Sequence, residues 1–145
     1  MKIAIGWDPN AREAKEELVK FIVKEELGTV TDFGSEDDIY AHAFRVAQAV
    51  ADGKYDRGIL LCGTGIGMSI AANKVRGAYA ALVSDAYSAK RARLSNDANI
   101  LCMGAFTIGN KVREELTAVF LNHEFIKGSS SQIKVEAYKE YDRER

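Results

Sequence analysis

Short apolar runs alternate with amphipathic stretches along most of the chain. Residues 12–27 carry one apolar face at helical spacing, made of Ala14, Leu18, Phe21 and Ile22. Similar patterns predict further helices at 43–53, 67–74 and 86–94, from 109 onward, and at 129–145, where the polar tail would fray at its end. Apolar runs predict strands at 2–6, 29–33, 57–62, 78–83 and 100–103.

The order of these elements indicates the fold class. The run at 57–62 is apolar at nearly every position, as in a strand that helices cover on both faces. Strands that alternate with helices pair in parallel through right-handed crossovers. The sequence therefore predicts an α/β fold, a doubly wound parallel sheet of about five strands with a helix at the C-terminus. A chain of 145 residues can bury one full core, so we expect a single domain over residues 1–145.

Charge and cysteine content exclude several classes of function. Twenty basic and twenty-one acidic residues leave a net charge of -1, and no segment gathers enough Lys and Arg to bind nucleic acid or a membrane surface. The first residues turn polar at once, and no run approaches the ~18 apolar residues of a membrane span, so no signal peptide or anchor is expected. Cys62 and Cys102 lack CxxC spacing, which favours neither disulfides nor a metal site and suits a cytoplasmic protein.

A glycine-rich loop, Cys-Gly-Thr-Gly-Ile-Gly at 62–67, follows the third predicted strand. Ligands of doubly wound sheets bind beyond the carboxyl ends of the strands, which is where this loop is expected to lie. The spacing is not the G-x-G-x-x-G of dinucleotide folds, because Met68 stands where the last glycine would be. No Gly-Lys-Ser/Thr follows, as a P-loop requires. The loop does provide unencumbered backbone N–H groups at a helix start, which suit an anion or a developing oxyanion.

Cys62 stands at the mouth of this loop, and its residue type alone supports two interpretations. The positive end of the helix would favour the thiolate, which could accept a proton at neutral pH. Equally, a free cysteine is often a small apolar filler at the end of a buried strand. Cys102, with no glycine loop after it, is expected to pack in the core. A cysteine hydrolase would need a histidine base, and the chain has only His42 and His123.

Two segments carry a resemblance to a known family. GILLCGTGIGMSIAANKVRG at 58–77 and AALVSDAYSAKRARLSNDANILCMGA at 80–105 resemble the sugar-phosphate isomerases that include ribose-5-phosphate isomerase B and the galactose-6-phosphate isomerase subunits. The similarity runs over nearly the whole chain. It implies a Rossmann-like fold, a homodimer or dimer of dimers with each active site at a subunit interface, a sugar-phosphate substrate, and no metal or other cofactor.

The resemblance also assigns residues to an aldose–ketose isomerisation through a cis-enediolate. It implies that Cys62 is the base, and that Thr64 and the loop N–H groups stabilise the enediolate oxygen. Asp8 matches an acidic residue that holds sugar hydroxyls, although capping of the first helix would equally explain it. The remaining substrate-side positions implied are Gly63, Gly65, Gly67 and Asn96.

Several positions depart from the family pattern. Ser95 stands where a ring-opening histidine is usual, Pro9 replaces a phosphate-side histidine, and Phe106 replaces a phosphate-binding arginine. Near the C-terminus, Ser130 and Lys134 align with an arginine pair, which leaves one positive charge of two. The resemblance thus preserves the proton-transfer residues and alters those for ring opening and phosphate.

Other side chains are candidates to compensate for these losses. Tyr40 could supply the crevice-lining tyrosine from a shifted position or simply pack, and His42 beside it could serve ring opening. The phosphate could instead be held by Lys134 or by one of three arginines, Arg12, Arg91 and Arg93.

Three functions remain open from the sequence. The first is an isomerase of a short sugar phosphate, either pentose 5-phosphate or tetrose 4-phosphate; a tetrose phosphate cannot close a furanose ring, so Ser95 suits it. The second is an isomerase of another sugar, either phosphorylated or unphosphorylated. The third is a non-catalytic sugar-binding subunit, against which Cys62 and Thr64 argue.

Overall fold

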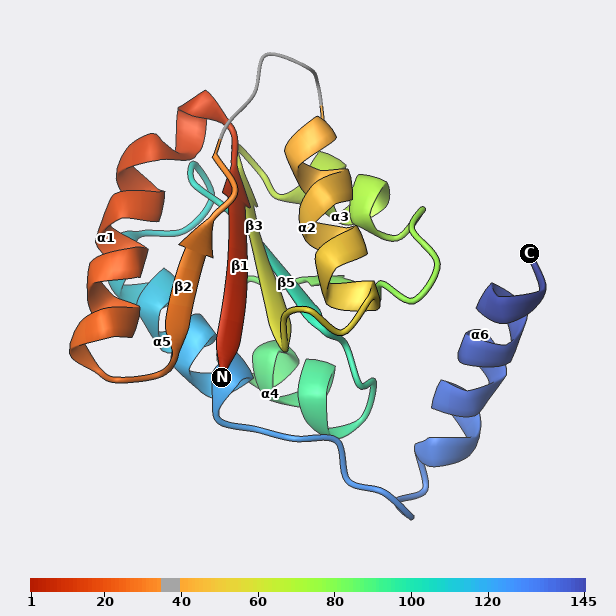
Figure 1. Cartoon of the computed structure of the whole chain (residues 1–145). Helices are drawn as coiled ribbons and strands as arrows, with labels where there is room; N and C mark the ends of the chain where they lie inside the picture. The colour runs from red at the N-terminus through yellow and green to blue at the C-terminus, as the bar shows by residue number, and fades with distance from the viewer. Residues whose placement is uncertain (35–39) are drawn as a thin grey trace.

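The computed structural model describes residues 1–34 and 40–145 (Figure 1). Its strands are β1 (Lys2–Trp7), β2 (Thr29–Asp32), β3 (Arg57–Cys62), β4 (Ala80–Leu82) and β5 (Ile100–Gly104). Its helices are α1 (Arg12–Lys24), α2 (Ala41–Ala51), α3 (Ile66–Ala72), α4 (Ala86–Leu94), α5 (Asn110–Leu121) and α6 (Gln132–Glu144), with a 3-10 turn, η1 (Pro9–Ala11), before α1.

The five strands form one parallel sheet in the order β2-β1-β3-β5-β4. Helices α1, α4 and α5 cover one face and α2 and α3 the other, while α6 stands to one side of the body (Figure 1). The predicted doubly wound α/β fold with a C-terminal helix is confirmed. Strands β2 and β3 pair with opposite edges of β1. The strand order therefore changes direction between β1 and β3, where such folds bind ligands.

Strand β3 is buried on both faces, as its continuous apolar pattern predicts. Ile59 and Leu61 pack under α1 and α5, whereas Leu60 and Cys62 pack under α2 and α3. This alternation places the Cys62 side chain on the α2–α3 face, at the last position of the strand.

Most elements differ from the predicted bounds by one to three residues, and helix α1 and strand β4 are two examples. Helix α1 stops at Lys24 rather than near residue 27, because Glu26 takes a left-handed conformation (φ 54°) and the Leu27 N–H bonds back to the Ile22 carbonyl at 3.0 Å. Strand β4 is only three residues long. It lies at the edge of the sheet and pairs on one side alone.

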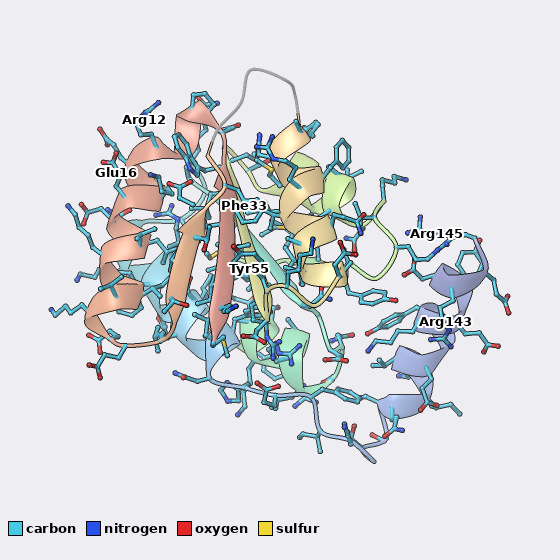
Figure 2. The ribbon with its side chains drawn as sticks, viewed as in Figure 1. Arg12, Glu16, Phe33, Tyr55, Arg143 and Arg145 are labelled. Atoms are coloured by element: carbon cyan, nitrogen blue, oxygen red, sulfur yellow. The ribbon has the colours of Figure 1, made fainter. Side chains whose placement is uncertain are left out.

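The end of α6 is not frayed, contrary to expectation. The carboxylate of Asp142, which is 6% exposed, accepts hydrogen bonds from the Gly77 N–H and the Tyr79 hydroxyl, both at 2.8 Å. Arg145 also donates to it, at 2.8 Å, and the arginine lies at the free end of α6 in Figure 2. These contacts join the C-terminal turn to the segment before β4.

Candidate active site

The loop after β3 brings a thiol against backbone donors. Cys62 is 8% exposed, and its Sγ accepts a hydrogen bond from the Gly65 N–H at 3.0 Å. Thr64 Oγ1 accepts from the Ile66 N–H at 3.2 Å. Gly65 has a φ of 81°, and a Cβ there would lie 2.9 Å from the Met103 backbone, so no larger residue fits this turn. The turn thus holds the sulfur and the loop N–H groups in one fixed arrangement.

The loop after β5 closes over the same backbone. The Ala105 N–H donates to the Cys62 carbonyl at 2.7 Å, and the Phe106 N–H donates to the Gly63 carbonyl at 2.9 Å. The Phe106 ring lies against Gly63 and is 72% exposed. These two loops therefore form a single block of structure at the carboxyl edge of the sheet.

Tyr40 reaches this block from the start of α2. It has a left-handed conformation (φ 66°), and its hydroxyl lies so close to Gly67 that a Cβ there would overlap the oxygen. The structure thus brings together Cys62, Thr64, Tyr40 and the loop glycines. His42, two residues further on in the first turn of α2, is buried at 3% exposure, and its ring-opening role stays a prediction.

Asp8 lies beside this block, at the end of β1. Its N–H donates to the Leu61 carbonyl at 3.0 Å, and its carboxylate caps the turn η1 by accepting from the Asn10 N–H at 2.9 Å. Asp8 thus caps the 3-10 turn that leads into α1, and not α1 itself, whose N-cap residue is Ala11. Contact of Asp8 with a sugar hydroxyl stays a prediction.

A cluster around Trp7, which sequence reasoning missed, lies at the same edge. Trp7 Nε1 donates to Asp32 at 2.8 Å, and Lys15 forms an ion pair with Asp32 at 2.9 Å. Burial would raise the pKa of Asp32, but the Trp7 and Lys15 contacts hold it below its ordinary value. The Arg12 guanidinium lies 5.0 Å from the Trp7 ring centre, at the end of α1 nearest the strand ends (Figure 2). Arg12, one of the candidate phosphate ligands from the sequence, is exposed there.

Ser95 and Asn96 lie at the opposite edge of the sheet. They follow α4 and lead into β5, so they stand at its amino end, in the lower part of Figure 1. Asn96 is exposed and donates to the Arg91 carbonyl at 2.9 Å. In the part of the chain that the structure describes, the buried Ser95 hydroxyl has no hydrogen-bond partner. One chain therefore does not bring Asn96 to Cys62.

Arg93 is engaged within the fold, which corrects its assignment as a candidate phosphate ligand. It is 2% exposed and donates to the carbonyls of His123 (3.1 Å) and Ala98 (2.5 Å). Its ion pairs with Asp97 (3.1 Å) and Glu124 (3.2 Å) bring four of its five N–H donors into use. A buried guanidinium held in this way serves the fold rather than a substrate phosphate.

Helix α6 completes the amino edge. Lys139 pairs with Asp97 at 2.5 Å, and the Tyr138 hydroxyl bonds to the Asn96 carbonyl. A hollow of about 380 Å³ lies between α6 and β4, with Asn96 and Tyr138 in its lining. Lys134 is exposed on the same helix. Within residues 1–34 and 40–145, no group of three His, Cys, Asp or Glu side chains could hold a metal, and no helix is long and apolar enough to cross a membrane.

Comparison with known proteins settles the family. The protein-family model described as Ribose/Galactose Isomerase matches residues 3–138 of this chain. The chain belongs to this family. It is 48% identical over 146 residues to ribose-5-P isomerase B from Listeria innocua, which covers 98% of this chain and 97% of the relative. It is 44% identical over 147 residues to D-erythrulose-4-phosphate isomerase from Pectobacterium atrosepticum, which covers 98% and 95% of the two chains.

The structural match within the ribose/galactose isomerase family is equally complete. The solved structure of type B ribose 5-phosphate isomerase from Trypanosoma cruzi has a TM-score of 0.92 at 36% identity, and the match covers 100% of both chains. The resemblance drawn from the segments at 58–77 and 80–105 is confirmed. Both edges of the sheet lie within the matched region.

Proposed function

We propose that this ribose/galactose isomerase family member interconverts the aldose and ketose forms of a short sugar phosphate, with a tetrose 4-phosphate as its preferred substrate. The observation that carries the reaction is the Cys62 sulfur at the mouth of the glycine loop, 3.0 Å from a backbone N–H and 8% exposed. The family relatives named for ribose 5-phosphate and for D-erythrulose 4-phosphate support this class of substrate.

The loop suits proton transfer next to a carbonyl. The Cys62 thiolate removes the proton from the carbon beside the carbonyl, and the electron pair of that C–H bond forms the carbon–carbon double bond of a cis-enediolate. The carbonyl oxygen takes the negative charge. The thiol then returns the proton to the former carbonyl carbon, while the hydroxyl proton of the adjacent carbon passes to the former carbonyl oxygen, which converts aldose to ketose or the reverse. No redox partner is required, because the substrate is oxidised at one carbon and reduced at the next.

Backbone donors stabilise the enediolate oxygen. The Gly65 N–H is directed at Sγ and the Ile66 N–H at the Thr64 hydroxyl, so the N–H groups of Thr64 and Gly67 are the candidates for the oxyanion. The Tyr40 hydroxyl beside Gly67 is placed to bond a sugar hydroxyl. Fixed donors of this kind need no rearrangement as charge develops.

The site is completed by a second copy of the chain. Asn96 and Lys134 lie at the far edge of the sheet from Cys62, so they serve the partner's site in a homodimer or dimer of dimers. Exposed apolar side chains on α3, β4 and α4 support such an interface: Ile66, Ile70, Leu82 and Tyr87 are 44–73% exposed.

The buried Ser95 hydroxyl favours the shorter substrate. A furanose must be opened by an acid or base before the carbonyl can react, and Ser95 is neither. A tetrose 4-phosphate is already open, because its terminal oxygen carries the phosphate. The enzyme therefore needs no ring-opening residue for it, whereas ribose 5-phosphate would need one, for which His42 is the candidate.

The test uses purified protein in heavy water with erythrose 4-phosphate, ribose 5-phosphate, allose 6-phosphate and unphosphorylated ribose, followed by NMR. The account predicts ketose product with carbon-bound deuterium, fastest from erythrose 4-phosphate. Faster turnover of ribose 5-phosphate would replace the tetrose assignment. Turnover of unphosphorylated ribose alone would overturn the phosphate assignment, and no exchange with any sugar would overturn the isomerase function.

A further inference from the structure

A buried arginine holds the loop between β5 and α5 from beneath. Arg113, in the first turn of α5, is 2% exposed. Its Nη2 donates to three carbonyl oxygens of the loop, those of Gly104 (3.0 Å), Ala105 (3.4 Å) and Ile108 (2.7 Å). Its Nη1 donates to Asn110 Oδ1 at 2.8 Å. One guanidinium therefore fixes the conformation of the whole loop relative to α5.

The presence of a cation at this position calls for an explanation. Burying a charge is unfavourable unless polar groups replace the water around it. Within residues 1–34 and 40–145, no carboxylate forms an ion pair with Arg113, and burial lowers its pKa. In the described structure the hydrogen bonds that compensate this charge come from backbone carbonyls and the Asn110 amide oxygen, and the charge of Glu114 adds a smaller favourable interaction. An apolar side chain would fill the space at lower cost, so the guanidinium is best explained by the loop geometry that it enforces.

The same loop holds the thiol-bearing backbone on its other side. Ala105 donates to the Cys62 carbonyl and Phe106 to the Gly63 carbonyl. Gly104 approaches this backbone so closely that a Cβ there would lie 2.8 Å from the Gly63 oxygen. A shift of the β5–α5 loop would therefore move Cys62 and the N–H groups that follow it.

We propose that Arg113 is a positioning residue of the isomerase, which sets the geometry of the Cys62–Gly65 loop through the backbone of residues 104–106. The kinetic part of this proposal rests on the proposed isomerase function. Arg113 touches no reacting atom, so its loss leaves substrate binding largely intact and misplaces the base and the oxyanion donors. The expected signature is a fall in kcat with little change in KM.

The kinetic test compares three variants. Arg113→Met keeps the aliphatic stem, and kcat should fall about 10- to 100-fold at a temperature well below its melting point. Arg113→Lys keeps the charge with fewer donors and should restore part of the loss. Leu116→Ala removes a buried side chain from the next turn of α5, away from the loop, and should lower Tm while kcat stays unchanged. Wild-type kcat in Arg113→Met, or an equal fall in Leu116→Ala, would overturn the proposal.

A second measurement does not depend on turnover. Amide hydrogen exchange of Ala105 and Phe106, followed by NMR, reports directly on the two bonds that hold Cys62 and Gly63. Arg113→Met should speed this exchange at least tenfold more than Leu116→Ala does. If the wild type shows no isomerase activity, the proposed function fails but this measurement still decides on Arg113. Unchanged exchange in Arg113→Met would refute the positioning role.

Discussion

The carboxyl and amino edges of the sheet are built from different chemical groups. At the carboxyl edge, backbone N–H and carbonyl groups hold the Cys62 loop, and Gly65 allows the close approach that this requires. At the amino edge, charged side chains fix the segment that carries Asn96, because the next residue, Asp97, forms ion pairs with Arg93 and Lys139. The first edge resembles an oxyanion site and the second a recognition surface.

The difference follows from what each edge has to do in the proposed reaction. Proton transfer depends on donors and a base fixed within a few tenths of an ångström, and backbone groups in a tight turn provide that. Recognition of a phosphate and sugar hydroxyls depends on charge and hydrogen-bond donors, which longer side chains supply. Changes at the carboxyl edge should therefore act on kcat, and changes at the amino edge on KM or on assembly.

The largest effect is expected from Cys62→Ala, which removes the proposed base at the carboxyl edge and leaves the amino edge unchanged. Removing the base should lower kcat for erythrose 4-phosphate by about 10²- to 10⁴-fold, with the fold intact by circular dichroism. The matched control is Cys102→Ala: that thiol is fully buried, burial raises its pKa, and it should be dispensable for turnover. Equal losses in both variants would mean that the cysteine effect is structural.

Lys134→Ala tests the amino edge. If this lysine holds the substrate phosphate of a partner site, KM should rise about 10- to 150-fold with kcat little changed, since a charge-assisted bond is worth ~1.5–3 kcal/mol. Initial rates over a range of substrate concentrations measure the split. Lys111→Ala, an equally exposed change on α5, should leave both constants as in the wild type. An unaltered KM in Lys134→Ala would leave the phosphate to Arg12 or Arg91.

Asp142→Asn should release α6 from β4 and lower the free energy of unfolding by about 2 kcal/mol, measured with urea. Burial alone would raise the pKa of Asp142, but hydrogen bonds from Gly77, Arg145 and Tyr79 lower it below its ordinary value. A depressed pKa in the folded state means that this stability is complete above about pH 4 and is lost as the pH falls further. The wild type should therefore approach the variant at low pH. Glu140→Gln, on the same helix, should show neither effect, and a pH-independent difference would contradict the assignment.

Ser95→Ala should have the smallest effect. The hydroxyl is buried without a partner among the described residues, so its removal should leave stability and the turnover of erythrose 4-phosphate within about twofold of the wild type. Steady-state kinetics and thermal unfolding measure both. An order-of-magnitude fall in kcat would show that Ser95 takes part in the chemistry.

The sequence predicted the elements with local, periodic signals. The residues of β3 and α4 match the expected ranges, and the glycine loop was located by its own motif. What escaped depends on contacts between residues distant in the chain, such as the link of Asp142 to Gly77 and that of Trp7 to Asp32. A pattern of apolar residues carries no information on such pairs.

The sequence around Arg113 contains an indication of its buried position. Arg113 precedes Leu116 and Phe120 at helical spacing, and both are buried. A charged residue on the apolar face of a helix is unusual unless the fold supplies partners for it. The partners are carbonyls of a preceding loop, whose direction no sequence pattern predicts. The separation of Asn96 from Cys62 was also available from the predicted parallel sheet, because Asn96 precedes β5 and Cys62 ends β3, so the two lie at opposite edges.

The most direct test of the account is complementation between chains damaged at opposite edges. One chain carries Cys62→Ala and the other Asn96→Ala with Lys134→Ala; each alone should be nearly inactive at a substrate concentration well below the wild-type KM. After co-refolding with random pairing, about half of the dimers are mixed and each has one intact site, so about a quarter of wild-type activity should return. If native mass spectrometry shows mixed dimers but the mixture stays as inactive as its parents, the site does not span two copies and the account is wrong.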